Sequence, residues 1–343
     1  QIDLEHGPLL VGALLSLERP EITSTRILLV IHHLVVDLVS WQVLLEDLEK
    51  LLLHELGLAS GCKLTPVLSS FKEYATQKEV PKAPREKDVG WVASLGKDFV
   101  GFDTWGAAKR EVGYIPPDLT QSLISSPLKP VEILLVALAQ ASGKFLESRL
   151  WVDLEAHGRD TNFAHTIGWF TELKAVEMVK HESLELALRE AKNRCRSQQT
   201  WSQTVPTICI NYHGQAGPVI SEAQCFSVAP EWETLSHHDL HPQDQREYLL
   251  EIEAMLVHDS DGCSLRIEWI YDIQLGESMP RWLQEFLHEV AVVIPFVAAS
   301  GNLGRCLQAP CDLLAPCSCS VSTFDAWVAE WFDGQLADME EVY

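Results

Sequence analysis

The 343-residue chain is long enough to bury a large core and to form two or more lobes. Apolar residues make up 47% of it and charged residues 22%, as in ordinary globular proteins. The formal net charge of −23 argues against nucleic acid and anionic membranes as partners, because no basic face is available to neutralise phosphate groups. No uninterrupted run of about 18 apolar residues occurs, so the sequence predicts no membrane-spanning helix.

The chain carries nine cysteines, most of them isolated within apolar segments. This usage is typical of reduced thiols in a cytoplasmic protein rather than of a disulfide framework. Cys306, Cys311, Cys317 and Cys319 cluster near the end but lack the C-x-x-C spacing of structural zinc sites, so we expect no metal. The first residue is Gln1 and no basic-then-apolar leader follows, so we expect a domain cut from a longer protein.

The first part of the chain predicts a hairpin, a long helix and a short helix. In order, the elements are strands over 9–17 and 26–31, a helix over 41–56 with an apolar stripe, and a short helix capped by Ser69 or Ser70 with Glu73 completing a capping box. The stretch 78–88 carries two prolines among alternating charges. We predict a linker there and place the lobe boundary close to it.

The remainder of the chain alternates between helices and strands. The predicted elements are helices over 117–125 and 131–145, a strand over 149–154 that delivers Glu155, a strand over 173–178, a helix over 181–197, a strand over 205–210 that ends at Asn211 and Tyr212, paired strands over 248–257 and 263–271, and a helix over 281–296. This alternation predicts a mixed α/β protein.

Two adjacent histidines lie where a buried strand gives way to a helix. The apolar run 27–31 is followed by His32 and His33, and the helix begins shortly afterwards. If the strand alternation continues past Ile31, the two imidazoles point to opposite faces, so only one of them faces a given cavity. The alternative interpretation is that both are core or loop histidines with satisfied hydrogen bonds.

Four sequence blocks carry a resemblance to a known family. The run HHLVVDLVSW at 32–41 resembles the HHxxxDxxSW signature of epimerization domains of nonribosomal peptide synthetases, the racemising branch of the condensation-domain superfamily. EAHGRD at 155–160, TIGWFT at 166–171 and NYHGQ at 211–215 are similar to that family's EGHGRE, TVGWFT and NYLGQ blocks. The four blocks occur in the family's order.

The resemblance implies an architecture. Two chloramphenicol-acetyltransferase-like lobes are expected in a V, with the active site in the tunnel between them. We expect 1–95 to be the remainder of an N-terminal lobe whose opening portion is missing, 96–302 to be the C-terminal lobe, and 303–343 to be a linker towards a following condensation domain. The source is expected to be a synthetase of fungal type.

The resemblance also implies a reaction and roles for individual residues. Racemising a thioester requires two acid/base groups that face each other across the α-carbon, with donors for the enolate oxygen. The catalytic pair is expected to be His33 and Glu155, with the pKa of Glu155 raised by desolvation. The remaining roles are substrate or enolate orientation by Asn211, Tyr212 and His32, and structural support by Asp37 (through an ion pair), Trp41, Arg159 and Trp169. No cofactor or metal is expected on this chain, because the substrate arrives on the phosphopantetheine of an upstream peptidyl carrier domain.

Four departures from the family pattern bear on the proposed site. Leu38 stands where the family usually has glycine, and its side chain would narrow the approach to His33. Ala156 replaces a glycine, His165 replaces an arginine whose permanent charge could stabilise an anionic intermediate, and His213 replaces a leucine. Two alternatives therefore remain beside the epimerase, namely a catalytically decayed docking or spacer domain and a peptide-bond-forming condensation domain.

Overall fold

The computed structural model describes residues 3–19, 22–78, 86–143, 149–196, 204–214, 227, 229, 241–259, 262–299, 320–322 and 325–326. These residues form two compact units that are discontinuous in sequence. Unit 1 takes its described residues mainly from 3–78 and 156–172, and unit 2 from 86–155, 173–214 and the segments after 241. The chain thus passes from unit 2 to unit 1 after Glu155 and returns at Leu173, a division that differs from the contiguous lobes expected from the sequence.

Unit 1 begins with a two-stranded antiparallel ribbon of β1 (Leu10–Arg19) and β2 (Ile22–Ile31), paired from Leu10↔Ile31 to Arg19↔Ile22. The 3₁₀ turn η1 (His33–Val35) follows, and then the helices α1 (Leu38–Glu55) and α2 (Phe71–Gln77). A second 3₁₀ turn, η2 (Thr161–Phe163), belongs to the segment 156–172. These elements confirm the predicted hairpin and both predicted helices.

Local capping explains where the two helices of unit 1 begin. The Asp37 side chain accepts from the Ser40 amide, so α1 starts at Leu38, three positions before the predicted Trp41. The predicted capping box at α2 is present, because the Ser70 side chain accepts from the Glu73 amide and the Glu73 carboxylate accepts from the Ser70 amide. The core beneath α2 is small and aromatic, and consists of Tyr74, Phe163 and Phe170 with Phe71 against them.

Unit 2 is built on a six-stranded mixed sheet with the strand order β4-β10-β9-β8-β5-β6. The strands are β4 (Lys109–Ile115), β5 (Leu150–His157), β6 (Thr171–Met178), β8 (Ile208–Gly214), β9 (Leu250–Asp259) and β10 (Gly262–Tyr271). β10 pairs antiparallel with β4 and β9, whereas β8 pairs parallel with β5 and β9. A short parallel pair of β3 (Glu86–Lys87) and β7 (Thr204–Val205) lies apart from this sheet.

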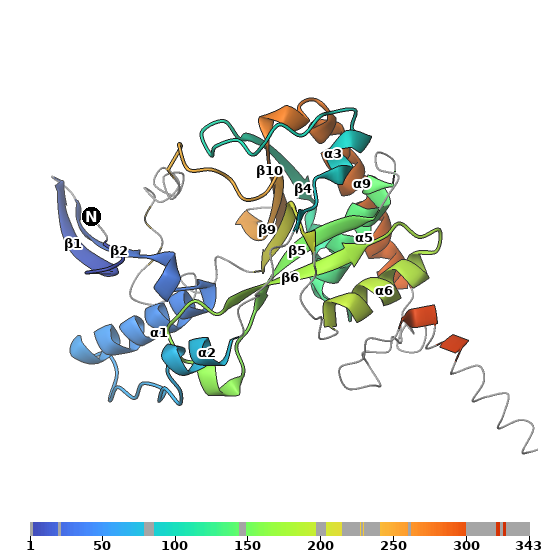
Figure 1. Ribbon diagram of the computed structural model, residues 1–343. Coiled ribbons are helices and arrows are strands. Elements are labelled where there is room, and N and C mark those ends of the chain that lie inside the picture. Colours follow the sequence, from blue (N-terminus) through green and yellow to red (C-terminus); the bar gives the residue numbers. More distant parts are fainter. Residues whose placement is uncertain are drawn as a thin grey trace, which may run out of the picture. The chain divides into compact units, whose positions relative to one another are not determined.

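Helices cover one face of the sheet (Figure 1). They are α3 (Gly90–Ser94), α4 (Pro117–Ile124), α5 (Pro130–Ser142), α6 (Leu184–Arg196) and α9 (Ser278–Ala299). Alternate residues of β9, namely Ile252, Ala254 and Leu256, are buried against these helices. The intervening residues of β9 lie on the other face, which carries polar side chains. The strands and helices predicted between 117 and 296 are confirmed with small shifts of their ends, except the strand over 205–210. That segment divides between β7, which ends at Val205, and β8, which begins at Ile208 and continues to Gly214.

The last long helix bears on the expectation that no helix of this chain spans a membrane. By length and composition alone, α9 passes the test for a helix that could cross a membrane. Its apolar face is part of the core of unit 2, through Met279, Trp282, Phe286, Val290 and Val293. A core helix passes the same test, so the finding is weak evidence for a span.

The predicted linker over 303–343 lies almost wholly outside the described residues.

Candidate functional site

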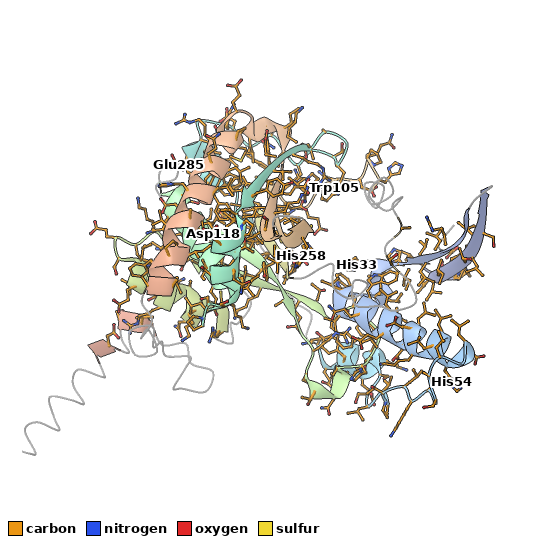
Figure 2. All side chains as sticks on the ribbon, turned by 180° about the vertical axis from the view of Figure 1, so that it is seen from behind. His33, His54, Trp105, Asp118, His258 and Glu285 are labelled. Atoms are coloured by element: carbon orange, nitrogen blue, oxygen red, sulfur yellow. The ribbon has the colours of Figure 1, made fainter. Side chains whose placement is uncertain are left out.

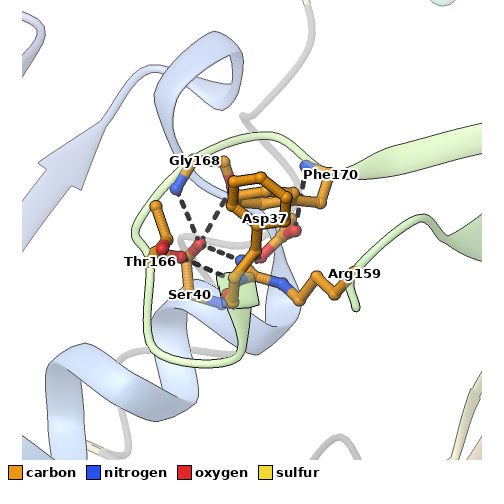
Figure 3. Close-up of polar contacts among 7 residues, drawn as sticks. Asp37, Ser40, Arg159, Thr166, Gly168 and Phe170 are labelled. Carbon is orange, nitrogen blue, oxygen red and sulfur yellow. Dashed lines mark hydrogen bonds and ion pairs between the residues drawn. The ribbon is translucent and has the colours of Figure 1, made fainter. Parts of the chain in front are cut away.

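A buried ion pair anchors the histidine segment of unit 1. Arg159 Nη2 lies 2.7 Å from Asp37 Oδ1, and the two side chains are only 7% and 1% exposed. The other terminal nitrogen of Arg159 donates to the carbonyl oxygens of Phe163 and Thr166, at 2.9 and 2.6 Å. The guanidinium also lies 4.0 Å above the Phe170 ring. An ion pair was expected at Asp37, and the structure identifies Arg159, from the EAHGRD block, as its partner (Figure 3).

The carboxylate of Asp37 also binds the backbone of two segments. It accepts from the amide of Ser40 at 2.7 Å and from the amide of Phe170 at 3.1 Å. Burial by itself would raise the pKa of Asp37, but the hydrogen bonds from Arg159, Ser40 and Phe170 outweigh burial and lower the pKa below its ordinary value. Asp37 is therefore held as a carboxylate that ties the start of α1 to the TIGWFT segment.

Two glycines of the sequence blocks are required by close packing. A Cβ on Gly168 would lie 2.4 Å from Cδ2 of the Phe71 ring, and a Cβ on Gly158 would lie 2.3 Å from the Tyr74 hydroxyl. That hydroxyl donates to the Glu172 carboxylate at 2.6 Å, so the space beside Gly158 is occupied by a partly buried polar contact. Gly158 and Gly168 are therefore needed for the packing of unit 1.

The two adjacent histidines have different surroundings. His32 caps η1, because its Nδ1 accepts from the Leu34 amide at 3.2 Å, and it is half-buried. His33 is exposed, and its ring meets Trp169 edge-on with 5.9 Å between the ring centroids. Figure 2 shows His33 near the start of α1 and His54 near its far end. Of the two adjacent histidines, His33 is thus the one with an accessible imidazole, and Trp169 is its aromatic neighbour.

In unit 2, Glu155 lies on β5 beside the strand that carries Asn211. The Asn211 Nδ2 donates to Glu155 Oε2 at 2.7 Å across the parallel β5–β8 pair. Glu155 is exposed, so the burial that the sequence predicts for this carboxylate, as the source of a raised pKa, is not found. The structure instead gives Glu155 a hydrogen-bonded orientation on the polar face of the sheet.

Asn211 and Tyr212 are separated by the alternation of the strand. Asn211 shares the polar face with Glu155, whereas Tyr212 packs against the core of unit 2, where burial raises the pKa of its phenol. The structure thus brings Glu155 and Asn211 together in unit 2. In unit 1 it gathers His33, Trp169, Asp37 and Arg159, with Trp41 half-buried in the first turn of α1. The pairing of His33 with Glu155, the orienting role of Tyr212, and the tunnel stay predictions.

Ser40, His213 and Glu253 were not among the predicted site residues. Ser40 Oγ accepts from Arg159 and exchanges hydrogen bonds with Gly168, and its place in the HHxxxDxxSW signature was the signal that could have indicated it. His213 Nε2 contacts the Glu253 carboxylate, a partner that sequence spacing does not reveal.

Metal-binding side chains do not gather within the part of the chain that the structure describes, where no group of three or more His, Cys, Asp or Glu could hold an ion. Cys62, Cys195 and Cys209 are free thiols there. The cysteine cluster at 306–319 lies outside the described residues.

Comparison with curated proteins finds two synthases and a nonribosomal peptide synthetase among the most similar relatives. The chain is 28% identical to a chondramide synthase of Chondromyces crocatus over 85% of its length, 23% identical to one component of the linear gramicidin synthase of Brevibacillus parabrevis over 100%, and 28% identical to nonribosomal peptide synthetase 8 of Aspergillus fumigatus over 74%. It spans only 8%, 5% and 3% of those proteins. No protein-family profile matches the chain.

Comparison with solved structures identifies the fold. The epimerization domain from the third module of tyrocidine synthetase B superposes with a TM-score of 0.66 and 24% identity, over 87% of this chain and 75% of that one. A condensation domain that mediates chain release from the enacyloxin polyketide synthase gives a TM-score of 0.57 and 15% identity, over 86% and 62% of the two chains. The chain therefore has the fold of the condensation-domain superfamily, and the curated proteins that it resembles include nonribosomal peptide synthetases.

Proposed function

We propose that this chain epimerizes, from L to D, an aminoacyl or peptidyl thioester tethered to a carrier-protein phosphopantetheine during nonribosomal peptide synthesis. The observation that carries the proposal is the hydrogen bond from Asn211 to Glu155, which holds a carboxylate in one orientation at an exposed position of the sheet. The ordered blocks and the fold supply the context. The domain would act in the cytoplasm, with a carrier domain upstream and a condensation domain downstream.

The reaction requires only that a proton leave the α-carbon and that another arrive on the opposite face. A thioester stabilises the resulting enolate far better than an amide does. In this proposal one of Glu155 and His33 takes the α-proton and the other delivers a proton to the opposite face. The hydrogen bond from the Asn211 amide holds the Glu155 carboxylate in one orientation for this step. The exposed His33 ring is kept in place by Trp169 and by the Asp37–Arg159 anchor behind it.

A non-catalytic docking or spacer domain is the second candidate. Two observations favour it, namely the exposure of Glu155 and the presence of Leu38 as the first residue of α1, close in sequence to His33. A peptide-bond-forming condensation domain is the third, because His33 alone could orient an attacking amine. The three candidates differ in whether the α-hydrogen exchanges with solvent and in whether a peptide bond forms.

The test is α-hydrogen exchange in deuterated water. The full-length protein is mixed with a carrier domain loaded with L-alanyl or L-phenylalanyl phosphopantetheine, or with the corresponding dipeptidyl thioesters. Deuterium at the α-carbon is measured by mass spectrometry, and chirality is measured after hydrolysis. We expect deuterium incorporation with inversion, reduced at least 100-fold in Glu155→Gln and in His33→Ala, since each removes one acid/base group.

Matched variants separate chemistry from folding. Glu182→Gln replaces an exposed glutamate of unit 2, and His54→Ala replaces an exposed histidine at the other end of α1, so both are expected to keep full exchange. Thermal melting of all four variants shows whether they fold. Absence of exchange on every thioester would contradict the epimerase and favour the docking domain. Peptide-bond formation between two loaded carriers without exchange would instead favour condensation.

A further inference from the structure

Polar side chains form one row across the polar face of the sheet in unit 2. Asn211 on β8 donates to Glu155 on β5 and is paired in register with Glu253 on β9. Glu253 is in turn paired with Glu268 on β10. The row therefore runs Glu155, Asn211, Glu253, Glu268 over four neighbouring strands. Three of its four members are carboxylates. Because like charges on neighbouring strands repel, positive groups on the same face are needed to balance them.

His213 reaches this row from an irregular position in β8. The register between β8 and β9 shifts between Tyr212 and Gly214, which leaves His213 as the extra residue of a β-bulge. Bulges re-aim a side chain and occur often beside active sites. The His213 Nε2 contacts the carboxylate of Glu253, and both side chains are about three-quarters buried. The imidazole is thus held against the residue directly opposite Asn211.

Carboxylates on both neighbouring strands act on His213, namely Glu253 on β9 and Glu155 on β5. Glu251, also on β9, is bound by Arg246 instead. On β10, the next strand out, Glu268 is already bound by Arg110 and Arg266. Burial would lower the pKa of His213, but the hydrogen bond to Glu253 and the charges of Glu253 and Glu155 raise it above its ordinary value. The carboxylates of this face therefore favour the positive form of the imidazole more than water does.

We propose that His213, clamped by Glu253, is a positioning residue for Glu155: its imidazolium charge keeps the Glu155 carboxylate ionised and ready to accept the α-proton. The inference rests on the proposed function, in which Glu155 is an acid/base group. It follows from reciprocity, because a carboxylate that favours the charged form of an imidazole has its own charged form favoured by the same free energy. The leucine of the resembling NYLGQ block cannot supply this charge.

The first test needs no activity and uses the full-length protein. The ring signals of its histidines are followed by carbon–proton NMR during a pH titration, and His213 is assigned as the signal lost in His213→Gln. We expect its midpoint to lie above the ordinary value for histidine, to fall most in Glu253→Gln, and to fall by roughly 0.5 unit in Glu155→Gln. A midpoint unchanged in Glu155→Gln would overturn the proposal.

The second test reads the same coupling in the reaction. In His213→Leu, the acidic limb of the pH profile of α-proton exchange should move to higher pH by about 0.5 unit, because a neighbouring positive charge has been removed. His213→Lys should restore the limb, whereas His258→Leu should leave it unchanged. A lower rate without a shift of the limb would reduce His213 to a structural role and contradict the inference. Should the wild-type protein show no exchange, the proposed function fails, while the titration still decides the coupling.

Discussion

The hydroxyl of Ser40 donates to the carbonyl oxygen of Gly168 at 2.9 Å and accepts from the amide of the same residue at 3.0 Å. It also accepts from Arg159 Nη2 at 2.7 Å. Both Ser40 and Gly168 are buried, so water cannot replace these contacts. One side chain of α1 thereby fixes the backbone of the TIGWFT segment, which lies 128 residues away in sequence.

Ser40→Ala is expected to lower the free energy of unfolding by about 2–3 kcal/mol, because it leaves the buried amide and carbonyl of Gly168 without this partner. Chemical denaturation of unit 1, followed by tryptophan fluorescence, measures the change. The control is Ser122→Ala on α4, whose hydroxyl donates to the Asp118 carbonyl of its own helix; it should stay within about 0.5 kcal/mol of the wild type. Equal effects of the two changes would contradict the role of Ser40.

Asp37→Asn is expected to alter the dependence of stability on pH. The folded-state pKa of Asp37 is lowered, so its carboxylate stabilises the protein above about pH 4, the unfolded value, and this contribution is lost as the pH falls through the folded value. The variant should lack that acid-dependent loss and should be less stable at pH 7 by about 3 kcal/mol, since Arg159 loses its anionic partner.

The measurement is the midpoint of chemical unfolding between pH 2 and 7. Asp118→Asn provides the comparison for Asp37→Asn, because Asp118 is exposed in the first turn of α4. Its unfolding midpoints between pH 2 and 7 should follow those of the wild type. An acid-dependent loss that persists in Asp37→Asn would show that another group is responsible.

Gly168→Ala is expected to destabilise unit 1 by about 1–3 kcal/mol, because the added methyl group would lie 2.4 Å from the Phe71 ring and force it to move. Thermal melting measures the effect. Gly90→Ala is the matched change, since its added methyl group would meet only an Asp88 oxygen at 4.0 Å. A Gly168→Ala protein that melts like the wild type would disprove the packing argument.

Leu38→Ala tests the leucine that follows Asp37 where the family usually has glycine. Leu38 is the first residue of α1, and no described residue other than glycine has a positive φ, so its backbone does not require glycine. If its side chain narrows the approach to His33, shortening it should raise kcat/KM for α-proton exchange several-fold while stability falls by about 1 kcal/mol. The exchange rate on a carrier-bound thioester is the measurement, and an unchanged or lower kcat/KM would show that Leu38 does not obstruct His33.

Periodicity and local chemistry predicted most of the secondary structure. The alternation in 248–271 predicted β9 and β10, and the Ser70–Glu73 spacing predicted the capping box that begins α2. Such features depend on residues close together in the chain, so the sequence alone reveals them. The start of α1 was missed because Asp37 was interpreted as a motif residue and not as a helix cap.

The sequence by itself determined the mixed α/β class, the order of the elements and the four blocks that carry the family resemblance. Only the tertiary structure decided that Arg159 is the partner of Asp37, that Tyr212 packs in the core while Asn211 binds Glu155, and that residues 156–172 belong with the N-terminal unit. The reason is physical: these contacts join residues far apart in the chain, and strand register and close packing select among partners that spacing leaves equivalent.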